Sequence, residues 1–290
     1  MSVAPALPST TEPPDLALVL SGGGARGFAH IGALQVLNEI ALPFDLVVGV
    51  SMGSIIGAGY AAGFTPAQMT DLAQTLRVRS VFRPRPGRQC FADSAGLRAA
   101  IHSVFGDRHF KDLERPLLVV SSSVLRGEPF VFSSGPLVDA LVASCSIPLL
   151  FAPVAHEGHH LLDGGMIDGL PLGLVRRVGA RRVVAVDASS HARMLLELPV
   201  VRQTARGVVR VLARRRPPDV PDTLDIFHRT LHHASQPRIR PPADVLIRPA
   251  FGYRTTYHYR DWPTMIARGR AAAEAARPAL EALGTTAAAR

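Results

Sequence analysis

Short apolar runs, glycine-rich turns and segments of helical periodicity follow one another along the chain. Residues 16–21 ("LALVLS") form an apolar run that ends in three glycines, and residues 28–40 then place apolar side chains at helical spacing. The same order returns with an apolar run at 44–50, a turn at 51–54 and a helix rich in small residues at 55–64. Two strand, loop and helix units in succession predict a parallel sheet covered by helices.

The pattern after residue 75 predicts further parts of this sheet. We expect buried strands at 116–124, 129–135 and 181–189, and helices at 97–105 and 137–146, the second of which stops before Pro148. Residues 77–96 hold arginines, prolines and a glycine, and are expected to form an exposed, mobile loop. Residues 192–245 have apolar spacing compatible with helices, interrupted by a basic tip and a proline-rich break.

The length and composition predict one domain with a disordered lead-in. Residues 1–14 are rich in proline, serine and threonine and lack the basic start and apolar stretch of a signal peptide. Residues 15–290 are expected to form the domain, with its core motifs at 15–190 and a helical part at 191–290. Residues 46–64 carry no formal charge, but their five glycines favour a buried strand, turn and helix over a transmembrane helix.

The charge is positive and comes almost entirely from arginine. The formal net charge is +9, the sequence pI is about 10.8, and Lys111 is the only lysine. Such a surface attracts nucleic acid, anionic lipid headgroups and phosphorylated substrates alike, so the charge does not choose among them. A biased base composition of the genome would also explain the preference for arginine over lysine. The two cysteines, Cys90 and Cys145, have no metal-ligand spacing and are expected to be reduced thiols, as in a cytoplasmic protein.

The loop "GGGARG" at 22–27 matches the glycine pattern of dinucleotide sites, but its surroundings do not. An acid should end the second strand to bind a ribose, whereas Asp45 begins that strand. A phosphate-binding loop of nucleotide hydrolases is excluded as well, because Phe28 stands at the position of its lysine. Either the glycines form a structural turn, or their backbone N–H groups bind an anion at a helix N-terminus, as in an oxyanion hole.

The sequence "GVSMG" at 49–53 lies between a predicted strand and a predicted helix, which is the context of a nucleophile elbow. Gly49 and Gly53 allow a sharp turn that leaves the hydroxyl of Ser51 exposed at the helix N-terminus. A serine needs a base to take its proton. The chain order serine, aspartate, histidine is available through Asp187 and one of three histidines, none of which lies in a motif: His191, His228 and His258.

Two further motifs offer other partners. "HEGHH" at 156–160 matches a zinc signature that requires a helix, but Pro153 and Gly158 favour a turn between two strands, so no metal site is expected. In "LLDGGMIDGLP" at 161–171, Asp163 ends an apolar run and precedes two glycines, so that it can approach another backbone closely. A turn residue or helix cap is the alternative role for Asp163, although Asp168 is the better candidate for a cap.

Taken together, these segments resemble the patatin-like phospholipases, particularly their short bacterial members. The resemblance rests on "GGGARG", "GVSMG", "ASCSIPLLFAPV" at 143–154 and "DGG" at 163–165, and residues 254–276 look like the closing helix of the family. The family often has an asparagine where this chain has Gly169. The resemblance implies a three-layer α/β/α fold with a mostly parallel central sheet, and a serine–aspartate dyad without a catalytic histidine or a cofactor. It assigns Ser51 as nucleophile and Asp163 as base, and an oxyanion hole to five residues of the glycine loop: Gly22, Gly23, Gly24, Arg26 and Gly27.

The resemblance also implies a reaction: hydrolysis of carboxylic esters of phospholipids or lysophospholipids through an acyl-enzyme. Arg26 is expected to orient the glycine loop, to neutralise a phosphate or simply to be solvated. Residues 55–64 and 146–151 can line an acyl channel or pack as ordinary core. The basic segments 77–88 and 210–216 either contact an anionic membrane peripherally, at its inner face, or form a solvated face; no nucleic acid partner is expected. The alternative function is a regulatory or lipid-binding protein of the same fold with little turnover.

Overall fold

The computed structural model describes residues 13–75, 81, 83–84, 92–148, 150–189, 241–252 and 258–288. Most of the expected lead-in, most of the basic segment 77–88 and all of the basic segment 210–216 lie outside these residues. The expected helices within 192–240 lie outside them as well.

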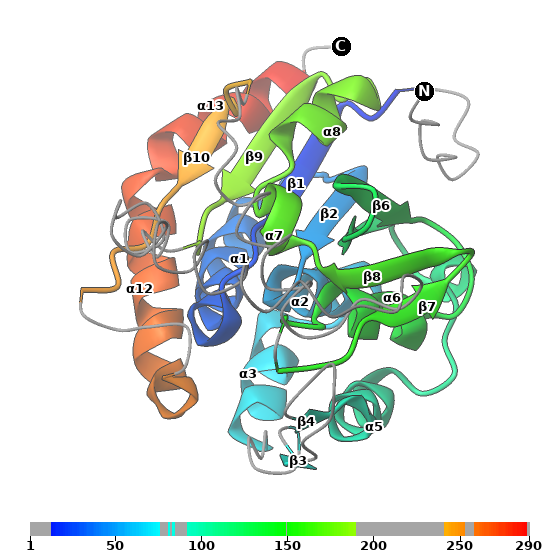
Figure 1. Ribbon diagram of the computed structural model, residues 1–290. Coiled ribbons are helices and arrows are strands. Elements are labelled where there is room, and N and C mark those ends of the chain that lie inside the picture. Colours follow the sequence, from blue (N-terminus) through cyan, green and yellow to red (C-terminus); the bar gives the residue numbers. More distant parts are fainter. Residues whose placement is uncertain are drawn as a thin grey trace, which may run out of the picture.

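An eight-stranded sheet forms the centre of the molecule (Figure 1). Its order is β10-β9-β1-β2-β5-β8-β7, with β6 paired to β5, and the first five strands in that order are parallel. β6 and β8 run antiparallel to β5, and β7 runs antiparallel to β8. The strands are β1 (Leu16–Leu20), β2 (Leu46–Val50), β5 (Leu117–Ser123), β6 (Glu128–Phe132), β7 (Val154–His156), β8 (His159–Asp163), β9 (Arg182–Val186) and β10 (Val245–Ile247); β3 (Arg83–Pro84) and β4 (Ala92–Asp93) form a separate pair.

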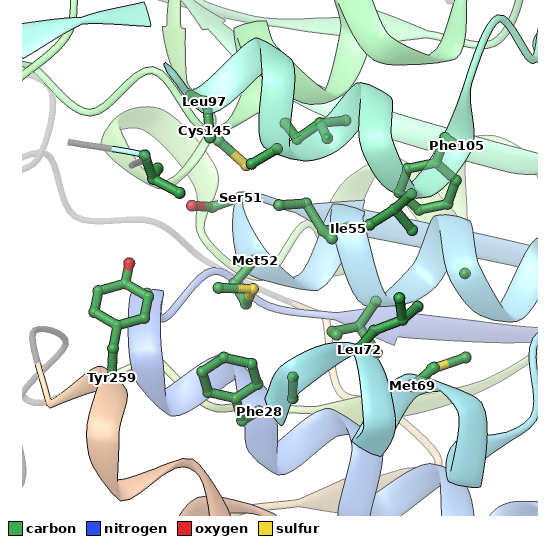
Figure 2. Close-up of a pocket in the computed structure, with 18 of the residues that line it drawn as sticks. Phe28, Ser51, Met52, Ile55, Met69, Leu72, Leu97, Phe105, Cys145 and Tyr259 are labelled. Carbon is green, nitrogen blue, oxygen red and sulfur yellow. The ribbon is translucent and has the colours of Figure 1, made fainter. Parts of the chain in front are cut away.

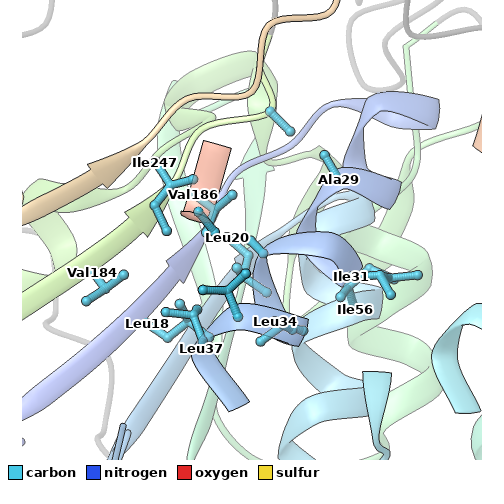
Figure 3. Close-up of a cluster of buried hydrophobic side chains, with 14 of the residues drawn as sticks. Leu18, Leu20, Ala29, Ile31, Leu34, Leu37, Ile56, Val184, Val186 and Ile247 are labelled. Carbon is cyan, nitrogen blue, oxygen red and sulfur yellow. The ribbon is translucent and has the colours of Figure 1, made fainter. Parts of the chain in front are cut away.

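Helices cover both faces of this sheet. They are η1 (Gly24–Phe28), α1 (Ala29–Ile40), α2 (Met52–Ala61), α3 (Pro66–Thr75), α5 (Ser94–Phe105), η2 (Phe110–Asp112), α6 (Leu137–Ser144), α7 (Gly165–Asp168), α8 (Leu172–Arg177), η3 (Tyr259–Asp261), α12 (Trp262–Ala275) and α13 (Arg277–Ala288). Alternate side chains of β1 point to opposite faces. Leu18 and Leu20 pack with α1 and α12, and Figure 3 shows this cluster, whereas Val19 packs with α8. The predicted three-layer α/β/α fold with a mostly parallel sheet is confirmed.

Helices α1 and α12 lie side by side and cross without side chains between them at one point (Figure 1). A Cβ atom on Gly32 would lie 1.9 Å from the carbonyl oxygen of Ile266, and a Cβ on Gly269 would lie 1.9 Å from that of Ala29. Only glycine fits at either position, so the two backbones pack directly on each other. This contact and β10 join the C-terminal segment to the core.

Three local expectations differ from the structure. The helix expected from residue 55 begins at Met52, so the turn before it is shorter than expected. Val81 is buried although it falls in the segment expected to be an exposed loop, because it packs with the apolar side chains of α5 and α6. β10 lies in the part that we expected to be helical, because its apolar run completes the sheet beside β9.

The segment 46–64 folds as predicted, into β2, a turn and α2. Asp168 is the last residue of α7, and the N-cap of the next helix, α8, is Pro171, so the expectation that Asp168 caps that helix is wrong. Among the described residues, no helix combines the length and the apolar character that crossing a membrane requires.

Candidate active site

The pairing of β5 brings Ser51 and Asp163 together. β2 pairs with β5 as far as Val50 opposite Val120, and β8 continues along the same edge of β5, with Asp163 opposite Ser121. Because β2 and β8 run in opposite directions, the residue that follows β2 and the residue that ends β8 meet head to head. Ser51 and Asp163 are those two residues, although 112 positions separate them in the sequence.

Ser51 occupies a strained turn between β2 and α2. Its backbone dihedrals are φ 53° and ψ −127°, a combination that costs a non-glycine residue about 1–3 kcal/mol. Two buried serines hold the turn: the Ser51 N–H donates to Ser144 Oγ at 2.8 Å, and Ser54 Oγ donates to the Ser51 carbonyl at 2.6 Å. Ser144 Oγ in turn donates to the carbonyl of Val120 on β5, at 2.7 Å. The turn therefore presents the Ser51 hydroxyl in one fixed direction.

That direction is toward Asp163. Ser51 Oγ donates to Asp163 Oδ2 at 2.5 Å, and the Gly165 N–H donates to the other carboxylate oxygen at 2.8 Å. Both side chains are buried, with 6% of Ser51 and 5% of Asp163 exposed. Burial raises the pKa of the Asp163 carboxyl from 3.8 to about 6, although these two hydrogen bonds oppose the rise. A buried carboxylate that accepts a serine proton is a candidate general base.

The first turn of α2 packs directly on the end of β1. A Cβ atom on Gly53 would lie 2.4 Å from the carbonyl oxygens of both Leu20 and Ser21, which are backbone atoms that cannot move alone. Gly49 is equally confined, since its Cβ would lie 2.5 Å from the Cα of Ser54. Both glycines of the predicted elbow are therefore required by close approach of backbones rather than by positive φ.

Replacing Gly53 by alanine is expected to lower the free energy of unfolding by about 1 to 3 kcal/mol, because the added methyl group overpacks this contact. It should also slow labelling of Ser51 by a fluorophosphonate at least about tenfold, because α2 must shift at its first turn. Urea denaturation and labelling kinetics measure the two effects. Gly173→Ala in α8 is the matched control, because its Cβ would meet only the end of the Arg177 side chain, at 3.6 Å. Equal stability of the two variants would contradict this reading of the elbow.

The glycine loop lies against the Ser51 turn, and some of its N–H groups are already engaged. A Cβ on Gly22 would lie 3.4 Å from that of Ser51. The Gly22 N–H donates to the Gly169 carbonyl at 3.0 Å, and the Arg26 N–H donates to the Gly23 carbonyl at 3.1 Å. Gly169, which stands where the family often has an asparagine, thus holds the loop through its backbone carbonyl.

The side chain of Arg26 packs rather than extends into solvent. Its guanidinium carbon lies 5.4 Å from the ring centre of Phe251, and partial burial lowers its pKa. Gly27 lies against α2, since a Cβ there would be 2.4 Å from Cγ of Met52. The Arg26 side chain is therefore not simply solvated, and its role in the loop stays a prediction.

Sequence reasoning missed a histidine and four serines that fix the site, among them Ser54 and Ser144, which hold the Ser51 turn. His30 Nε2 lies 2.8 Å from the Ser21 carbonyl, to which it must donate, and burial lowers the pKa of His30 to about 4, so that the ring is neutral. Ser21 Oγ accepts from the Ala188 N–H at 2.7 Å. The Ser146 carbonyl accepts the Asp163 N–H at 2.9 Å, and Ser144 holds the Ser51 turn as described above. Serines at the end of an otherwise apolar helix are a weak signal of such roles.

Of the other candidate bases, His258 is the N-cap of η3, one acid binds other groups, and two histidines fall outside the described residues. Asp187 binds Ser189 through its carboxylate and lies 3.5 Å from Arg248 Nε. Asp45 accepts the N–H groups of Asp15 and Leu16 at the opposite end of β1, which agrees with its exclusion as a ribose ligand. His191 and His228 fall in the segment that the structure does not describe.

The "HEGHH" segment forms the β7–β8 hairpin, as predicted. Glu157 and Gly158 make its turn with φ of 47° and 73°, and His156 pairs with His159 across it. In the described part of the chain, no group of three or more histidine, cysteine, aspartate or glutamate side chains is placed to hold a metal ion. Cys145 is a buried free thiol whose pKa burial raises, whereas Cys90 lies outside the described residues.

A cavity of about 150 Å³ opens beside the Ser51 hydroxyl (Figure 2). Its lining is almost entirely apolar and comes from α2, α3, α5, the ends of α1 and α6, and the region of Tyr259. Residues 55–64 and 146–151 both contribute to it, as the sequence suggested for an acyl channel.

Comparison with known proteins places this site in a family. The family model described as patatin-like phospholipase matches residues 18–176, which is more than half of the 290 residues. Human "Patatin-like phospholipase domain-containing protein 6" is 38% identical over 187 residues, which are 61% of this chain and 13% of that protein. An "Uncharacterized NTE family protein" of Mycobacterium tuberculosis is 34% identical over 177 residues, covering 60% of this chain and 49% of that one.

The chain thus spans half or less of the length of these relatives. Among solved structures, VipD from Legionella pneumophila is similar at 15% identity and a TM-score of 0.49, over 94% of this chain and 67% of that one. The match of the family model includes the glycine loop, the Ser51 turn and Asp163. The chain belongs to the patatin-like phospholipase family.

Proposed function

We propose that this protein is a serine acyl hydrolase that cleaves carboxylic esters of phospholipids or lysophospholipids. The observation that carries the proposal is the hydrogen bond from Ser51 Oγ to the buried Asp163 carboxylate, 2.5 Å long, at the edge of an apolar cavity. A nucleophile with a base in contact and an adjoining apolar space is what ester hydrolysis of a lipid requires.

In the proposed reaction, Asp163 accepts the Ser51 proton as Oγ attacks the ester carbonyl carbon. The backbone N–H groups of Gly23 and Gly24 are proposed to bind the oxyanion, because those of Gly22 and Arg26 already donate within the protein. The tetrahedral intermediate expels the alcohol, which takes the proton from Asp163 and leaves an acyl group on Ser51. Asp163 then takes a proton from water as the water oxygen attacks the acyl carbon. When the acyl–Oγ bond breaks, Asp163 returns that proton to Ser51 Oγ, and the fatty acid leaves.

We also propose that the protein acts in the cytoplasm and reaches lipid at the inner face of the membrane. A formal charge of +9 favours contact with anionic headgroups over neutral ones. Contact through the basic segments 77–88 and 210–216 is part of the proposal, and it concerns residues that lie mostly outside the structure.

Two measurements on the wild-type chain test the function. A fluorophosphonate probe should form a covalent adduct on the peptide that contains Ser51, identified by mass spectrometry. Incubation with a lysophospholipid should release free fatty acid. A folded wild-type protein that neither labels nor releases fatty acid would favour the alternative, a regulatory or lipid-binding protein of the same fold.

The activity should depend on the ionisation of Asp163. Only the carboxylate can accept a proton, and the pKa of this group is about 6, so kcat/KM should be constant above pH 7 and fall about tenfold per pH unit well below pH 6. Initial rates on a short-chain nitrophenyl ester between pH 4.5 and 9 measure the profile, with circular dichroism at each pH as the control for folding. A rate that is unchanged, or that rises, toward pH 5 would exclude Asp163 as the base.

A further inference from the structure

The cavity beside Ser51 follows two helices along matching faces. On α2 it is lined by Ser51, Ile55 and Gly59, and on α5 by Leu97, Ile101 and Phe105. Residues four apart lie on one face of a helix, so each set forms a line parallel to its helix axis. Figure 2 shows the two lines running together, with Leu97 near Ser51 at one end and Phe105 at the other.

The length of the cavity follows from the number of helical residues along each line. Eight residues separate Ser51 from Gly59 and Leu97 from Phe105, and eight residues of α-helix extend about 12 Å. An extended hydrocarbon chain with carbon–carbon bonds of about 1.5 Å advances roughly 1.3 Å per carbon. The distance from Ser51 to the far end therefore accommodates about ten carbons.

Among the described residues, two aromatic rings line the far end of the cavity. Phe64 stacks on Phe105 with the ring planes 3° apart and the centres 6.0 Å apart. The guanidinium carbon of the exposed Arg108 lies 5.9 Å from the centre of the Phe64 ring, so solvent lies beyond this pair. Among the described residues at this end, Phe64 therefore lies between the cavity and the surface.

Gly59 has no side chain and therefore leaves space inside the far end of the cavity. A Cβ on Gly59 would lie 3.5 Å from both Cε of Met69 and Cδ2 of Phe64, which is ordinary contact, and Gly59 has no positive φ. A larger residue is therefore tolerated by the backbone at this position and would occupy the end of the cavity. An unfilled apolar space of this size is unusual in a close-packed interior and suits an apolar ligand.

We propose that this cavity is a channel for one saturated acyl chain and limits that chain to about ten carbons, with Gly59 at the methyl end and the Phe64–Phe105 pair as the closing wall. The inference rests on the proposed function, in which the ester carbonyl lies at Ser51. For acyl chains short enough to fit inside the channel, each added methylene raises kcat/KM about fourfold. Methylenes added beyond the length of the channel do not raise kcat/KM further.

The test compares nitrophenyl esters of four to sixteen carbons, each below its micellar concentration. Wild type should gain in kcat/KM up to the decanoate and then level off or fall. In Gly59→Leu the ratio of the decanoate rate to the butyrate rate should fall at least about tenfold. Phe64→Ala should move the limit to longer chains. Gly173→Leu, at a partly exposed helical glycine away from the cavity, is the matched control, and Gly59→Ala replaces the leucine variant if that variant does not fold.

A second readout needs no turnover. Free fatty acids of six to sixteen carbons should raise the melting temperature of wild type increasingly up to decanoic acid and no further, and Gly59→Leu should lose the shift with decanoic acid. Equal chain-length profiles of Gly59→Leu and wild type in both assays would overturn the channel. Failure of the proposed function gives a different result, in which no ester is hydrolysed but the melting shifts keep their dependence on chain length and on Gly59.

Discussion

Replacement of Ser51 by alanine is expected to lower kcat for ester hydrolysis by at least about 10⁴-fold, because the acyl-enzyme then has no oxygen on which to form. The fold should remain, since the change removes one hydroxyl that interacts with the side chains of Asp163 and Cys145 and leaves the backbone of the turn intact. The Ser51 backbone keeps its hydrogen bonds: its N–H donates to Ser144 Oγ, and its carbonyl accepts from Ser54 and Ile55. The loss should therefore appear in kcat rather than in stability.

Fluorophosphonate labelling and nitrophenyl ester hydrolysis measure this effect, together with thermal unfolding. Ser103→Ala is the matched control, since Ser103 is an exposed serine on α5 whose hydroxyl bonds only to the carbonyl of Ala100. Hydrolysis by folded Ser51→Ala within about tenfold of wild type would mean that another group is the nucleophile. Labelling that persists on a different serine would identify that group.

The parts of the fold that local sequence determines could be predicted. Two units show this. Each spans about twenty consecutive residues and consists of an apolar run, then glycines, then apolar side chains at helical spacing: β1 with the glycine loop and α1, and β2 with the Ser51 turn and α2. The start of α2 was placed three residues late because the whole turn is compressed into Ser51, with φ 53°. The elbow motif predicted a sharp turn there but not that a single residue makes it. A single strained residue replaces the four-residue turn that its composition suggested.

The partner of Ser51 could not be chosen from the residues alone. Asp163 ends β8 and Asp187 directly follows β9, so each is an acid at the end of an apolar run and each was a candidate partner of the serine. The choice depends on β5, which pairs first with β2 and then with β8 along one edge, and that switch is a long-range property of the sheet. Resemblance to the family supplied Asp163 where the pattern did not.

The supporting serines and β10 escaped prediction for a related reason. Ser144 reads as the polar end of an apolar helix, and its role appears only when Val120 and Ser51 lie on either side of its hydroxyl. β10 has three residues and depends on β9 for its hydrogen bonds, so its own sequence carries little strand signal. Contacts that are distant in sequence decide both features.

Asp163→Asn is expected to abolish catalysis while making the protein more stable at neutral pH. An amide cannot accept the Ser51 proton, so kcat should fall by about 10⁴-fold. Burial raises the pKa of this carboxyl from 3.8 to about 6, so the folded state favours the protonated form, and its stability decreases as pH rises from about 4 to above 6. The cost reaches ~3 kcal/mol, and a neutral asparagine does not incur it.

Urea denaturation of wild type and Asp163→Asn at pH 4.5 and 7.5 separates these effects. The variant should gain in stability relative to wild type at pH 7.5 and gain much less at pH 4.5, where the wild-type carboxyl is already mostly protonated. Asp71→Asn, which makes the same change at an exposed carboxylate on α3, is the matched control. A variant that is inactive but equally destabilised at both pH values would mean that Asp163 is needed only for the fold. The expected pattern, higher stability with lost activity, is the signature of a buried base retained for chemistry at the expense of stability.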